Sequence, residues 1–491
     1  MTMHPFASRW WLSWLCTGSV LVLLGCPGDP TEAGADGPLS AGGGLDCSGR
    51  DRTAGACNDA KRCTSDADCD QRRCDLASSR CAQQSHEDGI QNLGETGTDC
   101  GGTSAPRRCG PGERCAATAD CDNVICNATT RVCDAPSGTD GLRNGTESDV
   151  DCGGTGPGAT PCPVDALCRD HADCASLGCD DRGRCAAGKS CTQKLGGRTC
   201  GEGELPSPTS DPRATHESCC ARVELAGSTA KLGKYHVTAG RMRQFVLREN
   251  GKIRDWVTKA AVPGFTPASS ALVPNSIDEA NSQLGSYWMG APNDRGSGQS
   301  KRSCDPDYAN GHTYFTNGAG ETASDYTQEE LDVKALNCVG WHLFKAFCAW
   351  DGGRVPTEAE LVAAYKNGGT TSYPWGDDFD GSRLNHARNS PFPVKPGRRM
   401  RGSGADAYDA DIAVFVSAPG RRPSGANAKG AHDVAGNLLH WTSNAEYRFN
   451  WTHSWENHED KGGTVGSDDW QRSWPEEPNG YYAIGGRCIY D

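Results

Sequence analysis

The aromatic side chains Phe, Trp and Tyr are confined to two parts of the chain, one near its start and one beyond Lys234. Trp10–Leu24 is a mostly apolar run near the start, whereas from Pro27 to Lys234 there is no Phe, Trp or Tyr. The remaining Trp residues all lie at or beyond Trp256. Because a packed core is built largely from such side chains, we expect the part beyond Lys234 to hold the hydrophobic core of the protein.

Two helices are predicted within that part. Residues that recur at helical spacing predict a helix with one apolar face: Trp341, Phe344, Phe347 and Cys348. Thr357-Glu-Ala-Glu360 has the form of a capping box, which opens a second helix running to about Lys366. Gly368-Gly369 ends this helix. The remainder contains Gly and Pro throughout, so we expect few long strands.

The apolar run at the start has the form of a signal peptide. Met1–Arg9 is short and cationic, and Trp10–Leu24 is shorter than the about 20 apolar residues that span a membrane. The run ends Leu23-Leu24-Gly25-Cys26. This resembles a bacterial lipobox, whose Cys is lipidated and becomes the mature N-terminus. An ordinary secretory signal with an incidental Cys is the alternative. We favour the lipobox, because Cys26 stands where the apolar run stops, and expect residues 1–25 to be removed.

Lipidation at Cys26 predicts an exported protein that is held on a membrane by its acyl chains. Pro27 follows the Cys in place of an Asp, so nothing indicates retention at the inner membrane. We expect the outer membrane or cell surface of a Gram-negative bacterium. Residues 26–46 are rich in Gly, Pro, Ala and Asp and predict a flexible tether. The formal net charge of −14 disfavours nucleic acid and anionic lipid as partners and suits solubility outside the cell.

The chain has 28 cysteines, which favours an oxidising compartment, and most of them belong to a repeat. Residues 47–189 contain three six-cysteine units of nearly equal spacing, at 47–81, 100–133 and 152–185. Without aromatic residues, such units predict three disulfides each in place of a hydrophobic core. Fifteen pairings are open within each unit. Zinc ribbons are the alternative, but the units contain no C-x-x-C pair.

The phrases that precede the second and third units also repeat. Asp88-Gly-Ile-Gln-Asn92 leads to Asp99-Cys100, and a fuller relative runs from Asp140 to Cys152. Both are similar to phrases of myxobacterial surface proteins. Alternating carboxylates at a Gly-permitted turn are ligands that Ca²⁺ accepts, although the spacing is not that of an EF-hand. Solvated turns are the alternative. The candidate calcium ligands are Asp140, Asn144, Glu147, Asp149 and Asp151.

Six phrases of the C-terminal part, residues 190–491, occur in an order that is shared with a known family. They are Tyr287-Trp-Met-Gly290, Asn337-Cys-Val-Gly-Trp341, Gly353-Arg-Val-Pro-Thr-Glu-Ala-Glu360, Tyr373-Pro-Trp-Gly376, Asp433-Val-Ala-Gly-Asn437 and Gly486-Arg-Cys488. Together they resemble formylglycine-generating enzymes, also called sulfatase-modifying factors. The resemblance implies a mixed α/β, C-type-lectin-like domain with little regular secondary structure, which here follows the small disulfide-rich repeats.

The same resemblance implies how the cysteines of this domain pair. It implies a disulfide between Cys348 and Cys488 and a second between Cys304 and Cys338. Two further disulfides would then form among the four remaining cysteines of the domain. These are Cys191, Cys200, Cys219 and Cys220.

Enzymes of that family hold Cu(I) between two active-site cysteines, because this soft ion selects thiolates. In the matching loop, which contains Ser454 and His458, Asn457 and Gly462 occupy the two cysteine positions. Cys488 is the only Cys after Cys348, so no shift of the alignment restores the pair. We therefore expect neither bound copper nor formylglycine generation by that mechanism.

A second departure concerns the family phrase Asn-x-x-Glu-Trp, which reads Asn437-Leu-Leu-His440-Trp441 here. An imidazole suits Ca²⁺ poorly, so the family's calcium site in this region is not expected. Related domains bind iron through three histidines, and His440, His453 and His458 lie in the corresponding half. Exposed or hydrogen-bonded surface histidines are the favoured interpretation of these three.

Two functions remain open. The favoured one is a non-catalytic binding or adhesion lipoprotein, in which the repeats form a stalk and the C-terminal domain binds a glycan or a peptide. The side chains expected around such a pocket are Trp441, Trp451, Trp455 and His458. The same Trp residues are equally explained as core. The alternative is an enzyme of the formylglycine-generating class, or a divergent oxidase with another site.

Overall fold

The computed structural model describes most of the chain. The described residues are 62–69, 74–82, 84–203, 215–286, 313–314, 328–385, 416–443, 448–449 and 484–491. Several predictions fall outside them: the signal and lipidation site, the tether, and Cys304. The same is true of the loop with Ser454, Asn457, His458 and Gly462. The chain divides into two compact units, Met1–Gln84 and Ser85–Asp491.

The disulfides of the repeats follow one order. In the second and third units the first cysteine bonds the second, the third bonds the fifth, and the fourth bonds the sixth. These bonds are Cys100–Cys109, Cys115–Cys126, Cys121–Cys133, Cys152–Cys162, Cys168–Cys179 and Cys174–Cys185. The described part of the first unit shows the same last two bonds, Cys63–Cys74 and Cys69–Cys81. The cysteines are themselves the buried core of each unit.

Each unit also contains a one-turn 3₁₀ helix directly before its fourth cysteine. These helices are η1 (Asp66–Asp68), η2 (Thr118–Asp120) and η3 (His171–Asp173). The first unit adds a short hairpin, β1 (Cys74–Asp75) with β2 (Arg80–Cys81). The sequence Ala-Asp-Cys therefore marks the same helix end three times.

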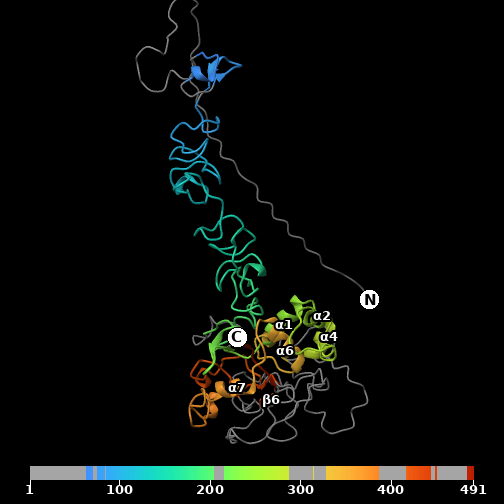
Figure 1. Ribbon diagram of the computed structural model, residues 1–491. Coiled ribbons are helices and arrows are strands. Elements are labelled where there is room, and N and C mark those ends of the chain that lie inside the picture. Colours follow the sequence, from blue (N-terminus) through green and yellow to red (C-terminus); the bar gives the residue numbers. More distant parts are fainter. Residues whose placement is uncertain are drawn as a thin grey trace, which may run out of the picture. The chain divides into compact units, whose positions relative to one another are not determined.

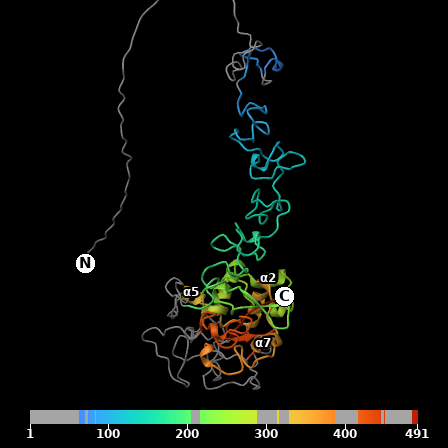
Figure 2. The same cartoon turned by 90° about the vertical axis from the view of Figure 1, so that its left-hand side faces the viewer.

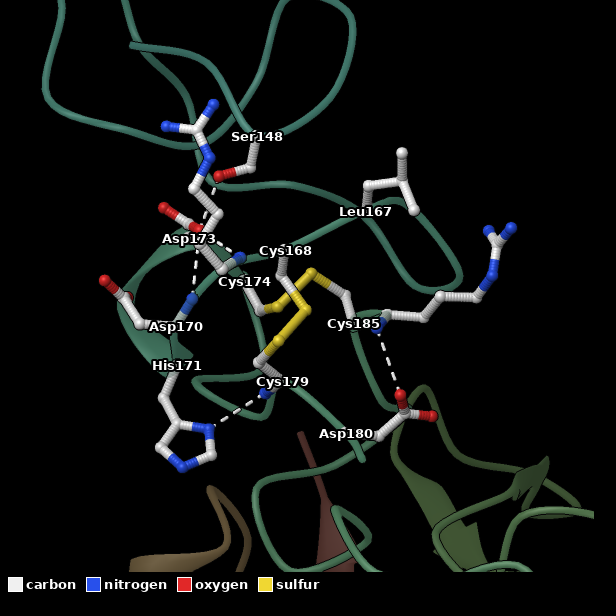
Figure 3. The surroundings of a disulfide bond; sticks show 12 residues. Ser148, Leu167, Cys168, Asp170, His171, Asp173, Cys174, Cys179, Asp180 and Cys185 are labelled. Atoms are coloured by element: carbon white, nitrogen blue, oxygen red, sulfur yellow. Dashed lines mark hydrogen bonds between the residues drawn. A yellow bond between two sulfur atoms is a disulfide. The ribbon is translucent and has the colours of Figure 1, made fainter. Parts of the chain in front are cut away.

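The aspartate of this helix ties the surrounding loops together, as Figure 3 shows for Asp173 beside its two disulfides. The Asp173 carboxylate accepts hydrogen bonds from the Ser148 hydroxyl (2.5 Å) and from the backbone N–H groups of Gly154 and Arg169 (2.8 and 2.7 Å). Burial alone would raise the pKa of Asp173, but these bonds together hold that pKa well below its usual range. The carboxylate thus replaces part of the missing apolar core.

The C-terminal domain consists of short elements, which gather into one body in both views (Figures 1 and 2). Its helices are α1 (Ala239–Arg248), α2 (Ile253–Lys259), α3 (Pro267–Ser270), α4 (Ile277–Asn281), the π-helical turn η4 (Ser282–Ser286), α5 (Gln328–Asp332), α6 (Trp341–Trp350), α7 (Glu358–Tyr365), η7 (Gly381–Arg383) and η9 (Pro423–Gly425). Its strands are β3 (Arg222–Glu224), β4 (Lys231–Gly233), β5 (Leu439–Trp441), β6 (Arg448–Phe449), β7 (Ile484–Gly485) and β8 (Ile489–Tyr490).

The strands form two small sheets, one of order β3-β4-β8 and one of order β6-β5-β7. β5 runs parallel to β7, and the other pairs are antiparallel. Both sheets use strands from the last eight residues, so the C-terminal segment closes the domain. The expectation of little regular secondary structure is confirmed for the described residues.

The predicted helix around Trp341–Cys348 is α6, and its apolar face lies in the main core. α6 lies beside α1 (Figure 1), where the ring of Phe245 contacts those of Phe347 and Trp350 at centroid distances of 6.0 and 4.9 Å. The second predicted helix is α7. Its capping box is formed as expected: Glu360 accepts from the Thr357 N–H at 2.7 Å. No helix of the described residues is long and apolar enough to cross a membrane.

A buried ion pair joins α1 to the end of α6. Nη2 of Arg241 lies 2.7 Å from Oδ2 of Asp351, and both side chains are almost fully buried. Asp351 also accepts from the Ser190 N–H and from the Tyr490 hydroxyl. The remaining N–H groups of the guanidinium reach the Ser190 hydroxyl and the Cys219 carbonyl oxygen. Five segments that are distant in sequence therefore meet at this pair.

The third repeat contacts the C-terminal domain close by. The Arg248 guanidinium, on α1, donates to the carbonyl oxygens of Lys189 and Leu177 at 2.8 and 2.9 Å. Lys189 in turn lies over the ring of Trp350, with its Nζ 4.4 Å from the ring centroid. The end of the third repeat is thus attached to the α1–α6 face.

We predict that Asp351→Asn lowers the free energy of unfolding by about 3–5 kcal/mol, because it leaves the buried Arg241 charge without a counter-ion. Urea denaturation of the oxidised mature chain measures this. The control is Glu224→Gln, which removes an exposed ion pair with Lys429 (3.0 Å) and should leave the midpoint nearly unchanged. Equal shifts for the two variants would contradict the role given to Asp351.

Candidate functional site

The residues predicted around the family's copper positions, Ser454, Asn457, His458 and Gly462, belong to the chain between β6 and β7 that the structure does not describe. The described cysteines nevertheless show whether a thiol is available for copper. Cys488 is bonded to Cys348, the pairing that the resemblance implies. Every cysteine among the described residues is disulfide-bonded. The described part of the chain therefore offers no thiolate to Cu(I).

The four cysteines at the start of the domain form two bonds, Cys191–Cys220 and Cys200–Cys219. Cys338 is also disulfide-bonded, whereas Cys304, its expected partner, lies outside the described residues.

A fully buried arginine, Arg487, lies directly next to Cys488 and below β5. Its guanidinium donates to the carbonyl oxygens of Gly233 and Lys234, both at 3.1 Å, and to those of His432 and Asp433, at 2.6 and 2.9 Å. The remaining Nε–H donates to Nε2 of His440 at 3.0 Å. Burial lowers the pKa of Arg487 to about 10, and the nearby Asp433 charge opposes that shift.

His440, which replaces the glutamate of the family phrase, is therefore a hydrogen-bond acceptor. Because its Nε2 accepts from Arg487, the ring is neutral and its proton lies on Nδ1. His440 is fully buried, so the surface position expected for it is wrong. It stacks on the fully buried His236, with ring centroids 4.5 Å apart. Burial, then the neighbouring ring and the Arg487 charge, lower the pKa of His440 well below its usual value. A cation at this position is disfavoured by the adjacent guanidinium, so His440 serves the packing of β5.

The phrase that precedes His440 is a set of tight turns. Asn437 has a φ of 64°, and its Oδ1 accepts from the Ser417 N–H at 2.9 Å. Gly436 has a φ of 89°, and a Cβ there would lie 2.7 Å from Cβ of Leu384. The residue types of this phrase are therefore fixed by backbone geometry and by close packing.

The aromatic residue of the same phrase is part of the core. Trp441 is 3% exposed, and its Nε1 donates to the Val339 carbonyl oxygen at 2.9 Å. Trp341 similarly donates to the Thr442 carbonyl oxygen at 2.7 Å. Of the two interpretations given to Trp441, the structure supports core. Trp451, Trp455 and His453 lie outside the described residues.

The five candidate calcium ligands are brought together only in part. Asp140 accepts from Nδ2 of Asn144, and Glu147 accepts from the Asn144 N–H, both at 3.0 Å. Asp149 and Asp151 face backbone N–H groups instead, those of Leu167 and Gly141. Among the described residues, groups of at least three His, Cys, Asp or Glu side chains have ligand atoms within 4.8 Å of one another. None of these groups contains Asp140, Glu147, Asp149 or Asp151. The five-ligand cage suggested by the spacing is thus not formed.

Two features of this region were missed in the sequence. Arg487 appears in the sequence only as part of a family phrase. A single arginine before a cysteine gives no local sign that its side chain is buried. The pairing of His236 with His440 joins residues far apart in the chain, so no periodicity predicts it.

We predict that His440→Gln weakens the pH dependence of stability. A histidine whose pKa is lowered on folding contributes its full stability above the unfolded pKa of about 6.5 and loses it as the pH falls. Gln still accepts from Arg487 but does not titrate. The stability of the variant should match wild type near pH 7.5, while its loss between pH 6.5 and 5 becomes shallower by up to about 1.4 kcal/mol per pH unit. Urea midpoints at several pH values measure this, and an unchanged pH profile would contradict it.

Comparison with known proteins shows that this chain is similar to formylglycine-generating enzymes. An inactive C-alpha-formylglycine-generating enzyme 2 of Bos taurus is 29% identical over 117 residues, which is 24% of this chain and 34% of that protein. A formylglycine-generating enzyme of Thermomonospora curvata is 34% identical over 107 residues, 21% of this chain and 31% of that protein. The formylglycine-generating enzyme of Mycobacterium tuberculosis is 35% identical over 104 residues, which is 21% of this chain and 30% of that protein. The chain spans about a third of the length of these relatives.

A solved structure, that of PvdO from Pseudomonas aeruginosa, covers 59% of this chain and 89% of its own at 14% identity and a TM-score of 0.26, which is too low to support an inference. The family model is more extensive: the sulfatase-modifying factor enzyme 1-like domain matches residues 208–479. Since this match spans more than half of the chain, the protein belongs to the sulfatase-modifying factor enzyme 1-like domain family.

Proposed function

We propose that this protein is an exported, lipid-anchored lipoprotein whose C-terminal domain binds a ligand and does not generate formylglycine. Cys26 would carry the lipid on the outer membrane or cell surface of a Gram-negative bacterium, and the disulfide repeats would act as a stalk. The C-terminal domain would have the C-type-lectin-like architecture that its family phrases imply.

The placement of the cysteines carries this proposal. Between Cys348 and Cys488 the sequence contains no cysteine, and these two are bonded to each other. A Cu(I) site needs two thiolates with the geometry to hold the ion and to leave room for a substrate thiol. Asn457 and Gly462 supply none. One relative is an inactive C-alpha-formylglycine-generating enzyme 2, so membership of the family alone does not establish catalysis.

The ligand we propose is a glycan or a peptide. Trp451, Trp455 and His458 provide aromatic faces and a polar group in the loop where the family places its site. Such a combination recognises the apolar face and the hydroxyl or amide groups of these ligands. Trp441 is not part of this surface, because it is buried.

The second candidate is an enzyme of the formylglycine-generating class, or a divergent oxidase that uses another site. Membership of the family favours it, and the missing cysteine pair opposes it.

We predict that the mature protein, supplied with copper and oxygen, forms no aldehyde on a sulfatase-type Cys-x-Pro-x-Arg peptide. Mass spectrometry of the peptide measures this, with an active family enzyme as the positive control. The variant Asn457→Cys/Gly462→Cys tests the reason for the loss, because it should gain Cu(I) binding that wild type lacks. Aldehyde formation by wild type that disappears in His458→Ala would contradict the proposal and favour the divergent oxidase.

A further inference from the structure

The links before the second and third repeats fold into the same turn. In the second link, the Glu147 N–H donates to the Asn144 carbonyl oxygen at 3.1 Å, and the Asn144 N–H donates to Oε2 of Glu147 at 3.0 Å. In the first link Asn92 and Glu95 form the same two bonds, at 2.8 and 3.1 Å. The two links therefore allow a comparison residue by residue, offset by 52 positions from Asp88 and Asp140 to Cys100 and Cys152.

The second link buries two oxygens that accept no hydrogen bond from the described residues. Oε1 of Glu147 and Oδ1 of Asn144 are both in this state, and their residues are only 5% and 8% exposed. Neither atom is accessible to bulk solvent, and no N–H or O–H of the described residues reaches them, although one of them belongs to a carboxylate. A buried charge of this kind needs a positive partner.

In the first link a histidine contacts the corresponding oxygen. There Nδ1 of His86 lies 2.8 Å from Oε1 of Glu95, the atom that corresponds to the unpartnered oxygen of Glu147. The residue that corresponds to His86 in the second link is Gly138. No side chain fits at Gly138, because a Cβ there would lie 2.6 Å from the Gly158 carbonyl oxygen. The second link therefore lacks the histidine and has no room for a substitute.

The neighbouring charges leave Oε1 of Glu147 available. The Arg169 guanidinium donates to the backbone carbonyl oxygens of Thr146 and Glu147, and Oε1 of Glu147 accepts no bond from it. Asp140 accepts from Nδ2 of Asn144, which turns the opposite atom of that amide, Oδ1, away from Asp140. Nδ2 also donates to the Asn123 carbonyl oxygen at 3.0 Å, which fixes the amide orientation. Asp140 thus positions the amide and is not itself a ligand.

We propose that a calcium ion binds in the second link, with Oε1 of Glu147 and Oδ1 of Asn144 as its side-chain ligands. Both ligands are hard oxygens on a flexible turn, which Ca²⁺ accepts and which zinc, with its preference for nitrogen and sulfur, does not favour. The site goes beyond the proposed function, since it lies outside the family domain. It is also smaller than the set suggested by the sequence, because Asp149 and Asp151 are engaged by backbone N–H groups.

The test is calcium titration of the metal-free mature chain by isothermal calorimetry. Wild type should bind one Ca²⁺ per chain, and Glu147→Gln should weaken binding at least tenfold, because it replaces the carboxylate with a neutral amide. Gln can still accept from the Asn144 N–H, so the variant should melt at the wild-type temperature in EDTA. The matched control is Glu95→Gln in the first link, which should leave calcium affinity unchanged.

A second variant keeps the proposal testable if Glu147→Gln does not fold. His86→Gly gives the first link the pattern of the second and should add a second Ca²⁺ per chain. The proposal is overturned by wild type that binds no Ca²⁺ at millimolar concentration, which would leave a buried water at Glu147. It is equally overturned by Glu147→Gln that binds as tightly as wild type, or by His86→Gly that binds no additional ion.

Discussion

Between Pro27 and Lys234 the chain has no aromatic side chain to bury, so covalent links between cysteines must supply the cohesion of this part. Within the repeats, each described disulfide joins cysteines that are 9 to 12 residues apart, which destabilises the unfolded chain by about 3 kcal/mol. The repeated order of the bonds brings the cysteines into the centre of each unit. The aspartate before the fourth cysteine then binds the backbone N–H groups that a small unit cannot pair within sheets, as Asp120 does for Gly102, Ala116 and Ala117.

The C-terminal domain combines a hydrophobic core with disulfides and with buried charged side chains that bind the backbone. Its helices are short, and its strands have two or three residues, so secondary structure alone does not hold it together. The Arg241–Asp351 ion pair connects α1 to the end of α6. The Tyr490 hydroxyl, which donates to Asp351, and the Cys348–Cys488 bond connect α6 and its C-terminal end to the C-terminal segment. Arg487 continues this network by binding four backbone carbonyl oxygens and His440. A domain built from loops is in this way fixed by contacts between side chains and backbone.

Local signals in the sequence predicted local structure well. The apolar spacing of Trp341–Cys348 and the capping box at Thr357 specify α6 and α7, because both signals act within one or two helical turns. The six-cysteine spacing predicted disulfide-built units but not their pairing, which depends on how the chain folds back on itself. Alternating carboxylates suggested a calcium cage of five residues, yet Asp149 and Asp151 bind backbone N–H groups instead. The burial of Arg487 and the stacking of His236 on His440 depend on contacts over more than 40 residues, which no sequence pattern specifies.

We propose that the cysteines of the mature protein serve its disulfides and its lipid anchor and that none of them binds copper. The most direct measurement is the number of free thiols in the mature, lipidated chain, denatured without reductant and treated with an alkylating reagent. We expect no alkylated cysteine by mass spectrometry, and we expect Cys47 to be bonded to Cys57 in the order shared by the other repeats. Two reactive thiols in the folded protein that are protected by Cu(I) would contradict it.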